Sequence, residues 1–491
     1  MRKKVLSRLW MKGGRAAGAV FLLLTVLCLF FPAAASAEQA GTEQTETTGA
    51  KTAVYMLPGR GASLKEITIP YIGKDGTVRS RVLQVYIPLE AEKPCPALLK
   101  THYGIDPSSR ELSWYLKEGW AVAAPKDPGP EENGLLTSDD LVFNSACYYT
   151  LRHLDEIDRT HIGMYGESAG GYICLLLNAA HVGIRGAWSS SGFCNLLFGL
   201  KEYWDYANSF NLEVLGELSP EEQQDSSVLM EKLPLPYLSG IYQSFAPNTE
   251  GFPDAEEDPA FWEAWSPCCL TECFTNPILF THYTSDALVP VDQLTKRFTY
   301  EQAGESLPEG FRCRLSDFEL PGRLSGSLAE QLPENSFSEV LHAAPSPDED
   351  LAVPLDLTRK FNLVVLDEGP VEGYAGHKKE NGAGILDGRP FFRTMFTWEW
   401  RDYFRMTREK LHMLIERYKG SSRLLPGHKD VDDTVYGSRA IYRKEVVEEL
   451  RDYLAGGGEI PEEYWEEILE ERPDFEKSIG SIRKKLSEKK N

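Results

Sequence analysis

A serine between glycines carries the strongest chemical signal in this sequence. Residues 162–172 read IGMYGESAGGY, so Ser168 stands between Gly166 and Gly170, with an apolar strand predicted before it and an apolar helix after it. A hydroxyl becomes a useful nucleophile when a sharp strand-to-helix turn holds it clear of the backbone beside a base, and such a turn needs small neighbours. We therefore predict Ser168 as a nucleophile for acyl transfer, with the N–H of Ala169 at the helix start facing the oxyanion.

A nucleophilic serine also needs a base and a carboxylate that orients the base, and both follow here in the chain order Ser, Asp, His. Asp286 comes just after the predicted strand 278–282, in the turn YTSDALVP. A carboxylate there can accept a hydrogen bond from imidazole Nδ1 and stabilise the imidazolium. His377 lies in a glycine-rich loop after the predicted strand 362–366, from which its Nε2 can reach the serine. Asp286 and His377 are therefore predicted to complete the triad.

Two other histidines are alternatives for the base. His342 is closer to Asp286 along the chain and follows a possible strand at 311–320, but no apolar strand adjoins the segment around it. His428 lies in the predicted helical tail and ranks below both. His377 remains the first choice, with His342 as its rival.

The second oxyanion donor is expected in the loop after the third core strand, which ends in the sequence ALLKTHYG. The backbone N–H groups of Tyr103 and Gly104 are the candidates, paired with that of Ala169. His102 is expected to shape this loop rather than to act as a base. Loss of one oxyanion donor costs roughly 3 to 4 kcal/mol of transition-state stabilisation in enzymes of this kind.

Strands and helices alternate through the middle of the chain, which predicts an α/β fold with a mostly parallel sheet and helices on both faces. The first two predicted strands alternate polar and apolar residues and suit an antiparallel edge hairpin, whereas the later ones are continuous apolar runs suited to a buried parallel centre. The eight predicted strands are 66–71, 79–87, 97–101, 120–124, 162–165, 186–190, 278–282 and 362–366.

Insertions and a tail interrupt or follow this alternation within a predicted catalytic domain at 55–400. The aromatic-rich segment 196–265 is interpreted either as a helical cap over the active edge of the sheet or as peripheral packing. Residues 302–358 are rich in Pro, Ser, Glu and Gly and are predicted to be a surface insertion with one short strand at 311–320. Beyond residue 391 the pattern is helical and amphipathic, so 401–491 is predicted to be a helical C-terminal extension.

The N-terminus has the features of a secretory signal peptide. Six basic residues precede an apolar run at 16–31, and Ala35-Ser36-Ala37 follows, which predicts residues 1–37 as a signal peptide cleaved after Ala37. An uncleaved membrane anchor is the alternative, because the apolar run approaches spanning length. Residues 38–54 contain almost no apolar side chains and are predicted to be a disordered spacer. A secreted or extracytoplasmic location is therefore expected.

Charge and cysteine content limit the classes of partner. With the six basic residues of the signal segment removed from 52, the mature chain keeps 46 against 74 acidic residues, a net charge of −28. Such a surface repels nucleic acid and anionic lipid. Cys268, Cys269 and Cys273 cluster, but no histidine stands at ligand spacing beside them, so no metal or cofactor is predicted. Export makes disulfides possible, with Cys194, Cys313 and this cluster as candidates.

Several of these segments together resemble the α/β-hydrolase superfamily, and within it the acyl-esterase and prolyl-oligopeptidase-like branch. The matching pieces are the Ile157-Asp158 turn, MYGESAGGY around Ser168, AWSSSG after the sixth strand, Ser266-Pro267, and NPILFTHYTSDALVPVDQ around Asp286. The resemblance spans most of 79–377 and implies the α/β-hydrolase fold with an eight-stranded sheet. Two features depart from the family: the usual His-Gly-Gly loop reads His102-Tyr103-Gly104, and the link from Asp286 to His377 is unusually long.

These observations predict a secreted serine hydrolase that cleaves carboxylic esters of a small or short acylated substrate through an acyl-enzyme. Esters come first because the flanking motifs resemble those of esterases and because no propeller domain, which the large oligopeptidases carry, precedes the catalytic one. A peptidase acting on short peptides is the alternative. A catalytically inactive hydrolase fold that serves as a binding protein is a second alternative from a different functional class. The sequence does not indicate an oligomeric state.

Overall fold

The computed structural model describes most of the chain from Thr45 onward. The described residues are 45–47, 50–57, 59, 61–73, 76–126, 138–235, 252–284, 286, 288–296, 314–343, 350–352, 355–356, 359–367, 385–397, 405–420 and 439–488. The predicted signal peptide, His377, His428 and Cys313 lie outside these residues. Within the described part, no helix has the length and apolar character needed to cross a membrane.

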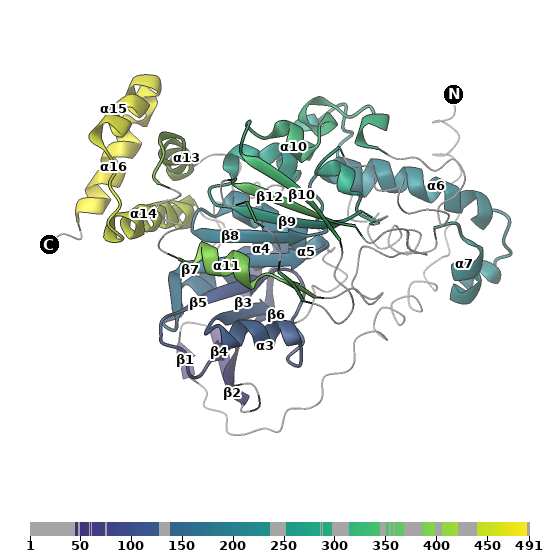
Figure 1. The fold of residues 1–491 in the computed structure, drawn as a ribbon, viewed down its shortest axis with the longest axis horizontal. Helices are drawn as coiled ribbons and strands as arrows, with labels where there is room; N and C mark the ends of the chain where they lie inside the picture. Colours follow the sequence, from purple (N-terminus) through teal and green to yellow (C-terminus); the bar gives the residue numbers. More distant parts are fainter. Residues whose placement is uncertain are drawn as a thin grey trace. The chain divides into compact units, whose positions relative to one another are not determined.

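One large sheet forms the centre of the fold (Figure 1). In spatial order its eleven strands are β1 (Thr45–Thr47), β2 (Ala50–Leu57), β3 (Ala62–Ile72), β4 (Val78–Pro88), β6 (Ala121–Pro125), β5 (Cys95–Lys100), β7 (Ile157–Glu167), β8 (Ile184–Ser190), β9 (Ile278–Tyr283), β12 (Phe361–Asp367) and β10 (Phe337–Ala343). A separate parallel pair joins β11 (Asp350–Ala352) to β13 (Ile385–Asp387).

All eight strands expected from the sequence are present, as β3, β4, β5, β6, β7, β8, β9 and β12. The β3–β4 pair is an antiparallel hairpin, as the alternating pattern predicted, and β4 is also antiparallel to β6. From β6 to β12 every neighbouring pair is parallel. The carboxyl ends of the central strands therefore lie at one edge of the sheet, where side chains from distant parts of the chain can meet.

Three further strands of the large sheet were not predicted. Regular structure begins before the expected start near Tyr55, because β1 and β2 extend the antiparallel edge into the segment predicted as a disordered spacer. The insertion at 302–358 is not confined to the surface, since it supplies β10, which pairs in parallel with β12 along its whole length. The strand predicted at 311–320 is wrong: residues Leu315–Asp317 form a short 3-10 helix, whose Leu315 is buried.

Helices cover both faces of the sheet. The α-helices are α3 (Arg110–Lys117), α4 (Ser138–Arg152), α5 (Ala169–Ala180), α6 (Tyr203–Leu215), α7 (Ser226–Lys232), α9 (Pro259–Trp265), α10 (Leu328–Gln331), α11 (Arg389–Met395), α13 (Arg408–Lys419), α14 (Arg439–Ala455), α15 (Glu462–Glu471) and α16 (Glu476–Ser487). The π-helix η4 covers Leu197–Glu202, and 3-10 helices are η5 (Glu222–Gln224), η7 (Pro267–Cys273), η8 (Val291–Gln293), η10 (Leu315–Asp317), η11 (Gly322–Ser325) and η14 (Pro473–Phe475).

Strand β7 shows how its two faces are covered. Successive residues of a strand point to opposite sides. Tyr165 packs against Phe392 of α11, with ring centroids 6.4 Å apart, while the next residue, Gly166, faces Gly170 of α5. Helices α11 and α5 thus lie on opposite faces of the sheet beside the predicted nucleophile.

The segment predicted as a cap is helical where it is described, but it does not form one body. Trp204–Ser244 belongs to a second compact unit, which contains most of α6 and all of α7, whereas η4 and α9 belong to the main unit. Within the second unit, Asn211 in α6 donates to the carbonyl of Leu235 at 2.7 Å and accepts from its N–H at 2.8 Å. Whether this segment covers the site stays a prediction.

The C-terminal helices α13 to α16 gather at one side of the main unit (Figure 1). Their buried apolar residues recur three or four positions apart, as expected for amphipathic helices, and form one cluster that includes Leu411, Leu414, Val446, Leu450, Trp465, Ile468, Ile479 and Ile482. Val182, just past the end of α5, belongs to the same cluster. The extension therefore shares a core with the hydrolase-like part.

Buried charges also join α14 to this part of the fold. Glu445 accepts hydrogen bonds from the N–H of Gly183 at 2.8 Å and from Nδ1 of His181 at 2.9 Å, and Arg152 pairs with Glu448 at 2.6 Å. Burial alone would raise the pKa of Glu445, but His181, Arg152 and the Gly183 N–H lower it to about 2. Glu445 is therefore ionised at neutral pH and holds the helix in place.

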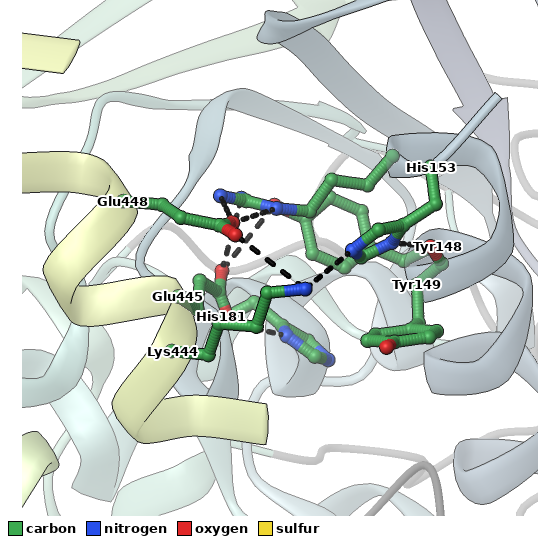
Figure 2. A pocket seen from close by; sticks show the side chains of 8 residues that line it. Tyr148, Tyr149, His153, His181, Lys444, Glu445 and Glu448 are labelled. Carbon is green, nitrogen blue, oxygen red and sulfur yellow. Dashed lines mark hydrogen bonds and ion pairs between the residues drawn. The ribbon is translucent and has the colours of Figure 1, made fainter. Parts of the chain in front are cut away.

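A small hollow lies beside these groups, between α4 and α14 (Figure 2). In this view Lys444 points toward both His153 and Glu448, with Nζ 3.2 Å from the His153 ring nitrogen and 3.7 Å from the carboxylate. The polar groups that line the hollow pair with one another across the two helices. We interpret it as part of the contact between the helical extension and helix α4, at the opposite end of α5 from Ser168.

Candidate active site

The turn at Ser168 has the geometry that a nucleophile requires. Strand β7 ends at Glu167 and helix α5 begins at Ala169, so the serine alone makes the turn between them. Its backbone has φ 52° and ψ −121°, a conformation that non-glycine residues rarely adopt. The N–H of Ser168 donates to Ser190 at 2.8 Å, and its carbonyl accepts from Tyr172 at 3.0 Å. These bonds hold the strained turn against the neighbouring strand and the first turn of the helix.

The two flanking glycines are required by space. A Cβ atom added to Gly166 would lie 2.4 Å from the backbone carbon of Gly170 and 2.5 Å from Oγ1 of Thr101. A Cβ added to Gly170 would lie 2.6 Å from the carbonyl oxygen of Thr101. Strand, helix and the loop after β5 therefore approach each other more closely than any side chain allows, which is the physical reason for the Gly-x-Ser-x-Gly pattern.

Asp286 is held rigidly in the turn after β9. Its side chain is fully buried, and Oδ1 accepts from the N–H groups of Leu288 at 3.1 Å and Val289 at 2.8 Å. The other oxygen, Oδ2, lies 3.3 Å from Nε2 of His282, which also lies 2.6 Å from the carbonyl of Val289. One carboxylate oxygen is thus bound by the main chain, and the other faces an imidazole on the preceding strand.

Sheet register relates Ser168 to Asp286. Glu167 at the end of β7 pairs with Ser190 of β8, and Ser190 pairs with Thr281 of β9. The ends of β7 and β9 are therefore two strand spacings apart, about 10 Å. Nucleophile and carboxylate leave the same edge of the sheet with one strand between them, which leaves space for a bridging side chain.

The two candidate bases, His377 and His342, differ in how far their segments of chain lie from Ser168. His377 lies outside the described residues, but the chain leaves β12 at Asp367, beside the end of β9, where the N–H of Thr284 donates to Leu366 at 2.9 Å. His342 lies on strand β10, although no apolar strand was expected beside it, and is half-buried, with Nδ1 2.7 Å from the carbonyl of Ala343. Four strand spacings, about 19 Å, separate β10 from β7. No imidazole spans that distance, so His342 does not reach Ser168.

The loop after β5 approaches the serine through a side chain. The backbone N–H of Tyr103, one of the predicted oxyanion donors, donates to the carbonyl of Thr101 at 2.7 Å. The ring of Tyr103 instead lies against the start of α5, with Cδ2 3.5 Å from the place of a Cβ on Gly170, and its phenol interacts with the side chain of Ser168. Burial first of all, and also Glu167 and Asp140, raise the pKa of Tyr103 to about 12, although the contact with Ser168 opposes this. The phenol therefore stays protonated at neutral pH and can donate.

Of the other two predicted donors, Ala169 directly follows the serine, whereas Gly104 lies against the end of β6. Ala169 is the first residue of α5, and the first N–H groups of a helix have no acceptor within the helix. Gly104 follows Tyr103, and a Cβ added there would lie 3.1 Å from the carbonyl oxygen of Pro125. The sequence reasoning did not consider the Tyr103 hydroxyl, because the usual glycine-rich loop contributes only backbone groups.

A buried ion pair lies directly behind this loop. His102 Nδ1 is 2.6 Å from Asp140 Oδ2, and the other oxygen of Asp140 accepts from Arg81 at 2.7 Å. Burial alone would raise the pKa of Asp140, but His102 and Arg81 lower it below its usual range. The sequence reasoning expected His102 to shape this loop, but Asp140 and Arg81 were not singled out, since nothing in their local sequence marks them as partners.

The cysteines of the described part are reduced. Cys194, Cys268 and Cys269 are buried without a disulfide, and the Sγ atoms of the last two are 3.8 Å apart. Within the described ranges, no group of three or more His, Cys, Asp or Glu side chains is arranged as a metal site. The expected disulfide is thus not formed among the described cysteines.

Comparison with known proteins yields distant structural similarities only. No protein-family model matches the chain, and no curated protein matches it. An acetyl xylan esterase from Paenibacillus sp. R4 is 16% identical over 50% of this chain and 76% of its own, with a TM-score of 0.33. A puromycin hydrolase is 14% identical over 51% of this chain and 39% of its own, with a TM-score of 0.31. The acylaminoacyl peptidase of Pyrococcus horikoshii is 12% identical over 72% of this chain and 48% of its own, with a TM-score of 0.36.

The strand order identifies the fold without these similarities. Numbered along the chain, the eight central strands lie in the order 1-2-4-3-5-6-7-8, with only the second antiparallel to its neighbours. The serine turn follows the fifth of them, and the turn with Asp286 follows the seventh. This chain has the α/β-hydrolase fold.

Proposed function

We propose that this protein is an exported serine hydrolase that cleaves carboxylic esters through an acyl-enzyme intermediate. The observation that carries the proposal is the position of Ser168, which stands in a strained turn at the start of α5 with the side chain of Tyr103 beside it. Such strain persists only where the surrounding structure enforces it, and it is concentrated at functional sites.

Acylation begins when Oγ of Ser168 attacks the carbonyl carbon of the ester while the imidazole of His377 takes its proton. Asp286 holds the imidazole through Nδ1 and stabilises the imidazolium. The carbonyl oxygen becomes an oxyanion that accepts from the N–H of Ala169 and the hydroxyl of Tyr103. When the tetrahedral intermediate collapses, the alcohol leaves with the proton from His377.

Deacylation repeats these steps with water as the nucleophile. His377 takes a proton from the water, the hydroxide attacks the acyl carbon, and the second oxyanion is held by the same two donors. Collapse returns the proton to Oγ of Ser168 and releases the carboxylic acid. No metal or cofactor is needed for this cycle.

Esters are proposed ahead of amides because the flanking motifs around Ser168 and Asp286 resemble those of esterases. A peptidase on short peptides is the alternative that the same site could serve, since acyl transfer to serine is common to both reactions. Both predict labelling by a fluorophosphonate, so the substrate decides between them.

The test combines active-site labelling with substrate choice. Purified protein is treated with a fluorophosphonate probe, and the labelled peptide is identified by mass spectrometry; we expect Ser168 to be labelled. Turnover of short-chain nitrophenyl esters is then compared with that of aminoacyl nitroanilides. The variant Ser168→Ala should lose roughly 10⁴-fold or more in kcat, whereas Ser113→Ala on α3 should change nothing.

The outcomes separate the candidate functions. Preference for the anilides would favour the peptidase over the esterase. Absence of labelling in a folded protein, judged by an unchanged melting temperature, would favour an inactive binding protein and reject the enzymatic proposal. Wild-type turnover by Ser168→Ala would reject this serine as the nucleophile.

A further inference from the structure

The loop that carries Tyr103 is attached to helix α4 by a buried charge network. His102 is fully buried, and its ring nitrogen Nδ1 lies 2.6 Å from Asp140 in the first turn of α4. Asp140 is also paired with Arg81 of β4 at 2.7 Å, and its side chain is 3% exposed. A carboxylate bound by both an imidazole and a guanidinium in a dry interior is a rigid anchor, because moving it would leave a buried charge unpaired.

The backbone at His102 is fixed by the same helix. Its φ is 68°, in the left-handed region that few side chains adopt, and its N–H donates to Oδ1 of Asn144 at 3.0 Å. Asn144 in turn donates to the carbonyl of Asp140 at 2.8 Å. Both the ring and the main chain of His102 are thus held by residues of α4, one helical turn apart.

The ring of His102 contacts the ring of Tyr103 edge to face. The two centroids are 4.3 Å apart at an interplanar angle of 78°. Within the described residues, Nε2 of His102 has no hydrogen-bond partner and is buried, so the imidazole contributes its ring surface rather than a second hydrogen bond. The ring of Tyr103 in turn lies against the start of α5, with Cδ2 3.5 Å from the place of a Cβ on Gly170, two residues after Ser168. His102, which α4 holds in place, therefore packs against Tyr103, and the side chain of Tyr103 lies beside Ser168.

We infer that His102, anchored by Asp140, is a positioning residue that holds the Tyr103 hydroxyl at the oxyanion site. This inference rests on the proposed function, in which Tyr103 donates to the oxyanion. His102 transfers no proton and touches no substrate. Its effect on the reaction passes through Tyr103, and it should disappear when the Tyr103 hydroxyl is removed.

The first test is a double-mutant cycle with ester turnover as the readout. His102→Asn removes the ring but tolerates the left-handed backbone better than most residues, so the loop keeps its path. We expect kcat to fall at least tenfold with KM changed less than twofold. In the Tyr103→Phe background the same substitution should cause no further loss. Equal losses in both backgrounds would overturn the inference, because the two residues would then act independently.

Asp139 provides a matched control for the anchor. It lies next to Asp140 in α4, is equally buried, and pairs with Arg79 of β4 at 2.8 Å. Asp140→Asn should lower kcat in the same way as His102→Asn, whereas Asp139→Asn should leave kcat within twofold of wild type. Similar losses in both Asp variants would indicate a general structural effect and overturn the inference.

A second readout does not depend on catalysis. In a crystal structure of the His102→Asn variant, the Tyr103 hydroxyl should no longer be within hydrogen-bond distance of Ser168. A phenol that stays in place would overturn the inference. If the wild-type protein proves inactive toward esters and the fluorophosphonate, the proposed function fails, while this structural readout still decides whether His102 positions Tyr103.

Discussion

Oγ1 of Thr101 donates a hydrogen bond to the carbonyl of Gly170 at 2.7 Å. This bond joins the residue that follows strand β5 to Gly170 in the first turn of α5. Gly170 lies two residues beyond the serine. The N–H of Thr101 donates to Tyr165 of β7 at 2.9 Å. The loop with Tyr103 and the turn with Ser168 are therefore fastened to one another, and their relative position depends on how closely the two backbones approach.

Gly170→Ala should separate these two elements. The new Cβ would lie 2.6 Å from the carbonyl of Thr101, a backbone atom that cannot turn aside. We expect a loss of about 1 to 3 kcal/mol in the free energy of unfolding, as for other overpacked sites, and a fall in kcat of at least tenfold. Denaturant unfolding and ester turnover measure the two effects.

Gly480→Ala is the matched control for that substitution. Gly480 lies inside helix α16, and nothing lies within 4 Å of a Cβ placed there. Alanine should stabilise this helix by up to about 1 kcal/mol and leave turnover unchanged. If Gly170→Ala behaves like Gly480→Ala, the close approach of Thr101 to the serine turn has no importance for the site.

Tyr103→Phe removes only the hydroxyl that interacts with the side chain of Ser168. If this group donates to the oxyanion, kcat should fall by roughly 10² to 10³-fold, the usual cost of losing one donor, with little change in KM. The ring remains, so the packing against His102 and the melting temperature should be preserved. Steady-state kinetics with a nitrophenyl ester measures this, and a wild-type kcat would assign the oxyanion entirely to backbone groups.

Comparing His377→Asn with His342→Asn identifies the base. His377 should be essential, since loss of the histidine removes proton transfer in both half-reactions, and kcat should fall by roughly a thousandfold or more. His342 is half-buried on β10, about 19 Å from the serine strand by strand spacing, so its variant should retain the wild-type kcat. The opposite ranking in turnover assays would contradict the assignment made from the sheet register.

Glu445→Gln tests the buried contact of the C-terminal helices. The substitution removes the carboxylate charge that His181 and Arg152 face in a buried position. We therefore expect a loss of about 3 to 5 kcal/mol in unfolding free energy at pH 7. An exposed residue of α15, Glu466, is the control, and Glu466→Gln should change stability by less than about 0.5 kcal/mol.

The pH dependence of this contact has a defined sign. The pKa of Glu445 in the folded protein is about 2, below the ordinary 4.5, so its contribution to stability is fully present above pH 4.5 and is lost as the pH falls toward 2. The stability difference between wild type and Glu445→Gln should therefore shrink over that interval. A difference that stays constant from pH 5 to pH 2.5 would show that ionised Glu445 does not stabilise the fold.

A structural feature could be predicted from the sequence wherever it depends on residues that are neighbours along the chain. The serine turn could be predicted because a backbone at φ 52° between a strand and a helix needs glycines at Gly166 and Gly170, and these leave a readable pattern. The central strands could be predicted because a buried parallel strand must be continuously apolar. Asp286 was recognisable because the strand before it marks the turn.

Prediction failed where the determining partner is distant in sequence. Strand β10 contains Glu339 and His342 and has no strong apolar pattern; it is a strand because β12 offers a free edge with matching register. The short helix at Leu315 formed instead of a strand, since its N–H is bonded to Asp292 and its side chain is buried. Neither partner can be identified from the local sequence.

The sequence alone therefore predicted the serine turn, the turn with Asp286, the positions of the central strands along the chain and the helical C-terminus, because steric and periodic requirements act over a few residues. Tertiary structure alone decided that the Tyr103 side chain faces Ser168, that Asp140 anchors His102, and that His342 stands too far away. Each of these depends on which strand or helix comes to lie beside another, and that is settled by packing of the whole sheet rather than by any neighbour along the chain.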